Sequence, residues 1–144
     1  MELNFDSAVR LTEALLPILR RSAPSAIVNV SSIAARISRP GTGSYSAAKA
    51  AIAAWSDSLH LEERSHGVHV ATVLPGFVAT EGFPQTQLTG RALTRWMVGK
   101  PEQVAGAIVA AAGGKVEVAV PRWYGVLPRL RSTAPALVRR SLRR

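Results

Sequence analysis

Apolar side chains recur with the spacing of a helix in three stretches of the chain. The first stretch covers residues from about Ser7 to Arg21, and Pro17 is expected to bend its last turns. The second runs from Ser44 to about Arg64 and is ended by Gly67, and the third runs from Pro101 to about Ala112. The apolar positions are Val9, Leu11, Leu15, Leu16, Ile18 and Leu19 in the first helix and Ile52, Trp55 and Leu59 in the second.

Short runs of β-branched residues lie between these helices. They are Ala26–Val30, Val68–Leu74 and Val116–Val120, and each is predicted to be a strand. Ala26–Val30 lacks the alternation of a half-exposed strand, so we expect it to be buried on both faces. Alternating helices and strands predict an α/β fold, in which helices flank a parallel sheet joined by right-handed crossovers. Residues from Phe77 to Lys100 are polar and mixed, and no element is predicted there.

The composition predicts a folded domain that has neither disulfides nor a membrane-spanning helix. Of 144 residues, 47% are apolar, which is enough for a core. Cysteine is absent, which excludes disulfides, thiolate zinc sites and a cysteine nucleophile. Because no apolar run is long enough to span a bilayer and no export signal is visible, we expect a cytoplasmic protein.

The net charge of +9 is concentrated at the C-terminal end. Residues 1–121 carry eleven Lys/Arg and nine Asp/Glu, whereas residues 122–144 carry seven arginines and no acid. We therefore divide the chain into a nearly neutral body, 1–121, and a basic tail, 122–144. A nucleic-acid partner is not expected for the body. Leucines interleave with the arginines of the tail, so the tail is expected either to complete the fold as a solvated segment or to contact a membrane surface weakly.

One short segment follows each predicted strand at the edge where catalytic groups of parallel sheets collect. Ser31 and Ser32 follow the first strand, Pro75–Phe77 follow the second, and Pro121 and Arg122 follow the third. The helix after the first strand and its loop also opens onto this edge.

That helix carries Tyr45 and Lys49 near its start, four residues apart and therefore on one face. A free tyrosine has a pKa of about 10, and a nearby cation favours the phenolate and lowers that value. The positive end of the helix acts in the same direction. Tyr45 is thus a candidate acid/base group, although such pairs are also common on solvated helix faces.

Three motifs together resemble the short-chain dehydrogenase/reductase family. They are "IVNVSS", then "SYSAAKAAI" with thirteen positions from Ser32 to Tyr45, and then "VLPGFVAT". Asn4 matches the helix asparagine of that family. The resemblance covers Asn4 to about Pro121 and implies the last three strands of a Rossmann-like, doubly wound sheet. It implies an NAD(P)-dependent oxidoreductase that interconverts an alcohol and a ketone by hydride transfer.

The resemblance assigns a role to each motif residue. Tyr45 is the general acid/base, Lys49 lowers its pKa and binds the nicotinamide ribose, and Ser32 rather than Ser31 stabilises the substrate oxygen. Asn4 holds a water that links Lys49 to solvent. The remaining cofactor contacts are the turn at Pro75 and Gly76 and two groups that hold the carboxamide, namely the Val78 backbone and the Thr80 hydroxyl.

One expected feature of the family does not occur in the sequence. A strand followed by a glycine-rich turn, which would hold the cofactor pyrophosphate, does not precede Asn4. Gly41-Thr-Gly43 lies in a loop and is read as a connector. The choice between NAD and NADP therefore stays open, and we expect a truncated chain. The alternative is a non-catalytic binding or regulatory half-domain that has lost the cofactor.

Other features give weaker expectations. His60, His66 and His69 are expected to lie apart, so no metal site is predicted. Residues 81–100 resemble the variable substrate lid of the family, and their apolar side chains favour a hydrophobic alcohol or ketone. These are Phe83, Leu88, Leu93, Trp96 and Met97. The small face of Ala47, Ala50, Ala51 and Ala54 permits either core packing or, as the resemblance implies, a homo-oligomer formed through the two long helices.

Overall fold

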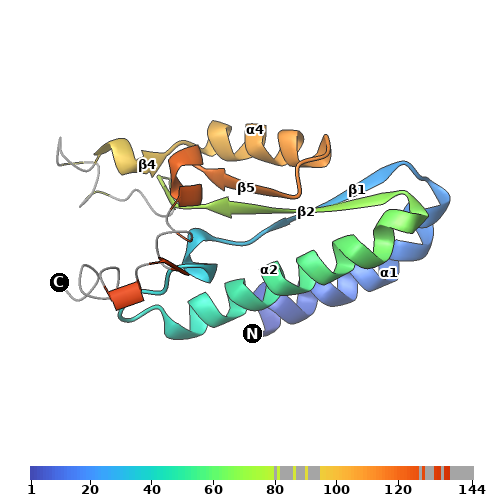
Figure 1. The fold of residues 1–144 in the computed structure, drawn as a ribbon, viewed down its shortest axis with the longest axis horizontal. Coiled ribbons are helices and arrows are strands. Elements are labelled where there is room, and N and C mark those ends of the chain that lie inside the picture. The colour runs from blue at the N-terminus through green and yellow to red at the C-terminus, as the bar shows by residue number, and fades with distance from the viewer. Residues whose placement is uncertain are drawn as a thin grey trace.

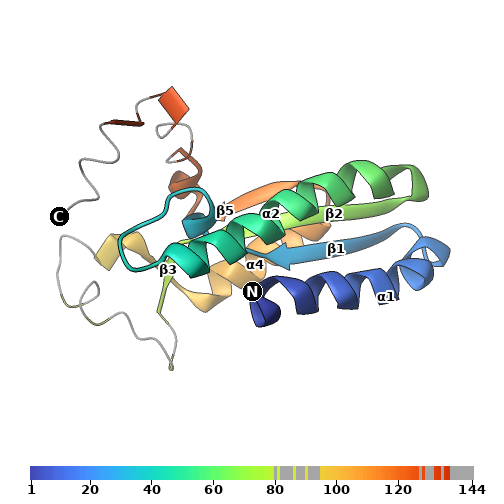
Figure 2. The ribbon, with the colours of Figure 1, turned by 90° about the horizontal axis from the view of Figure 1, so that it is seen from below.

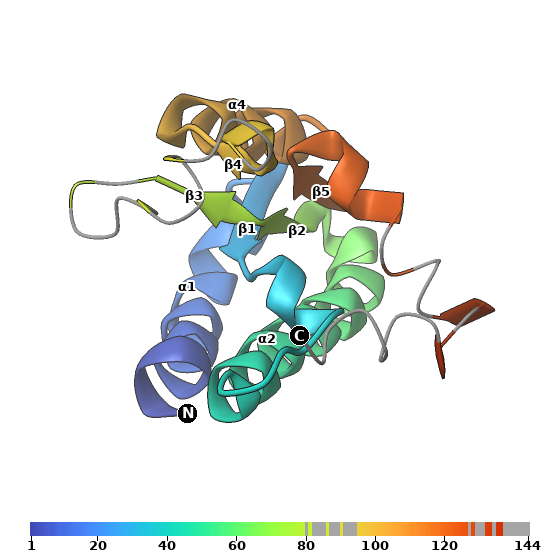
Figure 3. The same ribbon diagram turned by 90° about the vertical axis from the view of Figure 1, so that its left-hand side faces the viewer.

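The computed structural model describes residues 1–79, 81, 86, 90, 95–126, 128, 132–133 and 135–136. Its main sheet has three parallel strands in the order β1-β2-β5, which are Ser25–Val30, Val68–Pro75 and Glu117–Val120. The helices α1 (Ser7–Arg21) and α2 (Gly43–Glu63) cover one face, and α4 (Pro101–Ala112) covers the other (Figure 1; Figure 3). The predicted α/β fold with a parallel sheet and flanking helices is confirmed.

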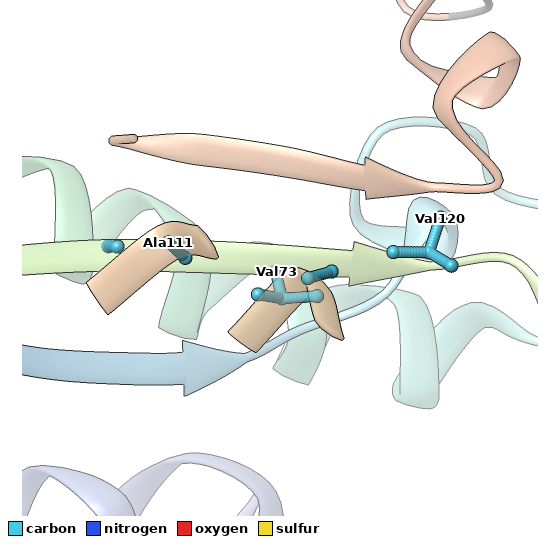
Figure 4. Packing of buried hydrophobic residues seen from close by; sticks show 5 residues of the cluster. Val73, Ala111 and Val120 are labelled. Carbon is cyan, nitrogen blue, oxygen red and sulfur yellow. The ribbon is translucent and has the colours of Figure 1, made fainter. Parts of the chain in front are cut away.

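The central strand β2 forms most of the core. It pairs with β1 from Val68 to Val73 and with β5 from Thr72 to Pro75, so both its edges are covered. Its side chains at Val68, Val70 and Val73 are fully buried. Figure 4 shows Val73 and Val120 of the sheet packed with Ala111 of α4. A strand buried on both faces needs apolar residues at successive positions, which explains why this run does not alternate.

Short elements connect the strands at the carboxyl edge of the sheet. A second, two-stranded parallel sheet pairs β3 (Phe77–Val78) with β4 (Val98–Gly99). The remaining elements are short helices of other types. One is a π-helix, η1 (Glu2–Asp6), and the others are 3₁₀-helices, namely η2 (Ile33–Ala35), η3 (Arg64–His66), η4 (Arg95–Met97) and η5 (Arg122–Val126). β3, β4 and η4 lie in the stretch from Phe77 to Lys100 where no element was predicted.

The predicted helices and strands occur within one or two residues of their expected ends. α1 and α4 have the expected bounds, and α2 begins at Gly43 instead of Ser44. Gly67 ends the second helical stretch with φ +73°, the left-handed conformation expected of a glycine there. None of the helices in the described part of the chain is long and apolar enough to cross a membrane.

The apolar face of α1 is not buried as a core face would be. Leu11 is 63% exposed and Ile18 is 51% exposed, and Thr12 is the buried residue of this helix. Seen from below, α1 lies beside α2 and under β1 (Figure 2). The apolar face of α1 is therefore open to a further contact.

Candidate active site

A pocket of about 700 Å³ opens at the carboxyl edge of the main sheet. This volume is within the range of about 300–1,000 Å³ that is usual for small-molecule sites. Its walls come from the end of β1, from η2 and the loop after it, and from the start of α2. The turn after β2, β3, η4 and η5 complete them. The topology thus brings segments that are distant in the sequence around one cavity.

Ser31 and Ser32 both line the pocket, but their hydroxyls are engaged differently. The Ser31 hydroxyl donates a hydrogen bond of 2.6 Å to the Lys49 carbonyl, which ties the end of β1 to α2. The Ser32 hydroxyl accepts a bond from the Ala34 amide and caps η2. The Ser32 hydroxyl in turn donates to the Pro75 carbonyl, and the distance of 3.4 Å between the two oxygens is long for a hydroxyl donor. Ser32 therefore holds the more available hydroxyl.

Tyr45 and Lys49 project from the first turns of α2 into the same pocket. The Lys49 ammonium lies 6.0 Å from the centre of the Tyr45 ring and donates to the Val30 carbonyl at 3.1 Å. Burial disfavours the charged form of Lys49 and lowers its pKa. Tyr45 is 44% exposed, and its hydroxyl forms no hydrogen bond with any other described residue. That hydroxyl is free to meet a bound molecule.

The turn after β2 forms the opposite wall. Pro75, Gly76 and Val78 line the pocket, and the Gly76 amide donates to the Val120 carbonyl at 2.7 Å. The ring of Tyr124 lies so close to Gly76 that a Cβ there would be 2.4 Å from its Cε2 atom. Only glycine fits at this point of the turn.

The structure brings together most, but not all, of the predicted site residues. Ser32, Tyr45, Lys49, Pro75, Gly76 and Val78 share the pocket. Asn4 lies exposed in η1, which packs against α2, and it is not part of the pocket wall. Thr80 lies outside the described residues.

The wall residues that were not anticipated include Arg39 and Tyr124. Tyr124 is 3% exposed, and its hydroxyl donates to the Met97 carbonyl at 3.1 Å. Burial raises the pKa of this phenol. Tyr124 lies four residues after the end of the third strand, so the strand-end rule that singled out Pro121 and Arg122 could have been extended to it. The burial of Tyr124 also shows that the beginning of the segment 122–144 packs on the body of the protein.

The histidines were predicted to lie apart, and for two of them this prediction is wrong. The rings of His60 and His69 meet edge to face with centres 5.5 Å apart. They come from α2 and β2, whose packing against each other the sequence pattern alone did not show. Among the described residues, which include His66, no three histidine, cysteine, aspartate or glutamate side chains lie close enough together to hold a metal ion.

Comparison with known proteins gives the family. A family model described as short chain dehydrogenase matches residues 1–91. The chain is 43% identical over 77 residues to the oxidoreductase YbbO of Escherichia coli strain K12, which covers 54% of this chain and 29% of YbbO. It is 31% identical over 112 residues to a 3-oxoacyl-[acyl-carrier-protein] reductase of Synechocystis, which covers 75% of this chain and 44% of that protein.

Solved structures agree with the sequence relatives. A crystal structure of a short chain dehydrogenase from Burkholderia cenocepacia J2315 in complex with NADP matches with a TM-score of 0.82 and 26% identity. The match covers 100% of this chain and 59% of that one. A short-chain dehydrogenase from Streptomyces avermitilis matches with a TM-score of 0.70 and 27% identity. The chain spans less than half the length of the curated relatives named above. With a family model over more than half of its residues and this agreement in fold, the chain belongs to the short chain dehydrogenase family.

Proposed function

We propose that the chain carries the catalytic part of an NAD(P)-dependent oxidoreductase that interconverts an alcohol and a ketone, with Tyr45 as general acid/base. One observation carries this proposal. Ser32, Tyr45, Lys49 and the turn from Pro75 to Val78 line a single pocket although they come from separate elements. The NADP in the Burkholderia relative supports the choice of cofactor class.

The residues present fit the nicotinamide end of such a cofactor. Lys49 supplies an ammonium that lines the pocket and pairs with no carboxylate among the described residues, which supports the proposal that it binds the ribose hydroxyls. The turn at Pro75 and Gly76 offers a wall without a side chain at Gly76, and the Val78 backbone follows it. When bound, the cofactor supplies or accepts the hydride.

The protein supplies the proton. In reduction, the Tyr45 hydroxyl gives its proton to the substrate oxygen, and in oxidation the phenolate removes the proton of the alcohol. The same oxygen accepts a hydrogen bond from Ser32, whose present bond to Pro75 is long enough to be exchanged. Ser31 is the less suitable donor because its short bond to Lys49 holds the helix in place.

Two further expectations belong to this proposal. The predicted water-holding role of Asn4 and the carboxamide contact of Thr80 rest on the resemblance to the family. We also propose that the chain self-associates through α1 and α2, because Leu11 and Ile18 on α1 and Ala47 on α2 are exposed.

The names of the curated relatives suggest the first substrates to test. Because the Synechocystis relative is a 3-oxoacyl-[acyl-carrier-protein] reductase, we propose a 3-oxoacyl thioester or a hydrophobic ketone as the substrate. Trp96, which is 60% exposed, and the pocket residue Met97 are the described members of the predicted apolar lid.

The proposal is tested by replacing Tyr45 with phenylalanine in the full-length natural protein that contains this chain. We expect kcat for NADPH-dependent reduction of acetoacetyl thioesters to fall by about 100-fold or more, since phenylalanine removes the hydroxyl that supplies the proton in this proposal. The affinity for NADPH should change little. Ser31→Ala is the matched control for Ser32→Ala, and only the second should lower kcat strongly.

Retention of more than a tenth of kcat by Tyr45→Phe would show that Tyr45 is not the acid. Binding of NADPH by the wild-type protein without turnover of any ketone would favour the alternative, a binding or regulatory module.

A further inference from the structure

The pocket wall is positively charged. Its sixteen described residues include two cations, Arg39 and Lys49, and no aspartate or glutamate. Thr42, at the N-terminus of α2, also lines it, so the positive end of that helix faces the same space. The first turn of α2 contains no acidic residue that would offset this charge.

Arg39 differs from the paired arginines of the molecule. Arg20 pairs with Glu63, and Arg36 pairs with Asp57 and Glu117. Arg39 is paired with no carboxylate of the described residues. A cation in a pocket that gives it no acid is a binding group for an anion from outside.

The backbone of Arg39 is fixed by a tight turn. The Thr42 amide donates to the Arg39 carbonyl at 3.1 Å, Pro40 and Gly41 occupy the two central positions, and Gly41 has φ +78°. This is the pattern of a type II β-turn. The Thr42 hydroxyl adds a second bond to the same carbonyl at 2.8 Å and accepts one from the Arg39 amide at 3.1 Å.

The side chain of Arg39 is placed as well. Its guanidinium carbon lies 4.6 Å from the centre of the Phe77 ring, which is a cation–π contact between its own loop and β3. A guanidinium in such a contact still has N–H donors for hydrogen bonds. These donors suit the two oxygens of a carboxylate or phosphate.

We propose that Arg39 is a specificity-determining residue that binds an anionic group of the substrate, a carboxylate or a phosphate, while the substrate carbonyl lies at Tyr45 and Ser32. This inference rests on the proposed function and names its substrate class. Lys49 does not serve the same purpose, because it is committed to the cofactor ribose and to the Val30 carbonyl. Among the described wall residues, Arg39 is the cation that remains for the substrate.

Two matched pairs of ketones test the proposal in the full-length natural protein. One pair is 4-oxopentanoate and its methyl ester, and the other is acetoacetyl-coenzyme A and acetoacetyl-N-acetylcysteamine. Each pair has the same carbonyl with and without the anion, so the first detects a carboxylate site and the second a phosphate site. In Arg39→Met, which keeps an unbranched chain over Phe77, we expect the ratio of kcat/KM for the preferred anionic ketone to that for its neutral partner to fall about tenfold or more.

Arg39→Lys, which keeps the charge, should restore part of this ratio. Arg10→Met, an exposed arginine on α1, should leave it at the wild-type value. Binding of 4-oxopentanoate and coenzyme A is measured in parallel by calorimetry, which needs no turnover, and should weaken in Arg39→Met alone. The preference for the anion should also decrease with added salt, since Arg39 is exposed to solvent.

An unchanged ratio in Arg39→Met, with unchanged binding of both anions, would overturn this inference and leave the proposed oxidoreductase intact. If the wild-type protein reduces none of the four ketones, the proposed function fails. Calorimetry then still decides whether Arg39 binds an anion.

Discussion

Gly76 is restricted by a residue of the segment that follows β5. The Tyr124 ring occupies the space of a Cβ at Gly76, with Cε2 at 2.4 Å and Cζ at 2.7 Å. Tyr124 is itself held by its bond to the Met97 carbonyl and by stacking on Trp123, with ring centres 4.1 Å apart. It cannot move aside without breaking these contacts.

We therefore expect Gly76→Ala to lower the free energy of unfolding by about 1–3 kcal/mol, as overpacking does, and to reduce activity because the pocket wall moves. Gly106→Ala is the matched control: Gly106 lies within α4 with nothing near its Cβ position, so alanine should stabilise the protein by about 0.5–1 kcal/mol. Urea unfolding followed by circular dichroism measures both. Equal stability of Gly76→Ala and the wild type would mean that Tyr124 yields easily.

Local spacing was sufficient to predict some of the site residues. Tyr45 and Lys49 share a helix face through a fixed interval, and Ser32 follows a strand whose apolar run is plain in the sequence. Tyr124 and Met97 could not be paired in this way, because their contact depends on how η4 and η5 meet. Contacts between distant, irregular segments leave no periodic signal.

At the scale of elements, α1 and α2 are joined by an ion pair between Arg20 and Glu63. Arg20, in the last turn of α1, donates from Nε at 2.8 Å and from Nη2 at 2.5 Å to the two carboxylate oxygens of Glu63, the last residue of α2. Glu63 is 2% exposed. The hydrogen bonds from Arg20 are the main reason why the pKa of this carboxyl lies below its ordinary value.

A carboxyl whose pKa is lowered on folding stabilises the folded state when the pH is above its unfolded-state pKa of about 4.3, and this contribution is lost as the pH falls through the folded-state pKa. Glu63→Gln should therefore unfold at a lower urea concentration than the wild type at pH 7. The difference should shrink progressively below about pH 4.

Glu62→Gln is the control for this ion pair, since Glu62 is the exposed neighbour and its carboxylate accepts a hydrogen bond from the Ser58 hydroxyl instead of from an arginine. It should unfold much as the wild type does across this range. If Glu63→Gln destabilised the protein equally at pH 3 and pH 7, this result would contradict a stabilising ion pair between Arg20 and Glu63.

Regular elements were predictable and short ones were not. The three long helices and three main strands follow from apolar periodicity, because each buries a continuous face. β3 and β4 have two residues each, too few to show any period. They exist because their backbones pair beside the pocket, with the Ala79 amide donating to the Gly99 carbonyl at 3.2 Å.

At the scale of the whole molecule, two surfaces lack a partner within the described part of the chain. β1 pairs with β2 along one edge, and no described strand pairs with its other edge. Leu11, Leu15 and Ile18 form an exposed apolar row on α1. An apolar strand edge and an apolar helix face both favour association with another chain.

These surfaces lead to the last prediction, which concerns the 144 residues expressed by themselves. We expect this chain to self-associate and to bind neither NADH nor NADPH at micromolar concentration. No strand of the described main sheet leads through a glycine-rich turn into a helix, so the pyrophosphate lacks the helix N-terminus that usually binds it. Size-exclusion chromatography with light scattering measures the association, and nucleotide fluorescence measures the binding. The double variant Leu11→Lys and Ile18→Lys should reduce association if α1 is the surface involved and should change it little if the β1 edge is. A compact monomer that binds either nucleotide at micromolar concentration would show that these 144 residues form a working unit, with the pocket at Tyr45 sufficient to hold the cofactor.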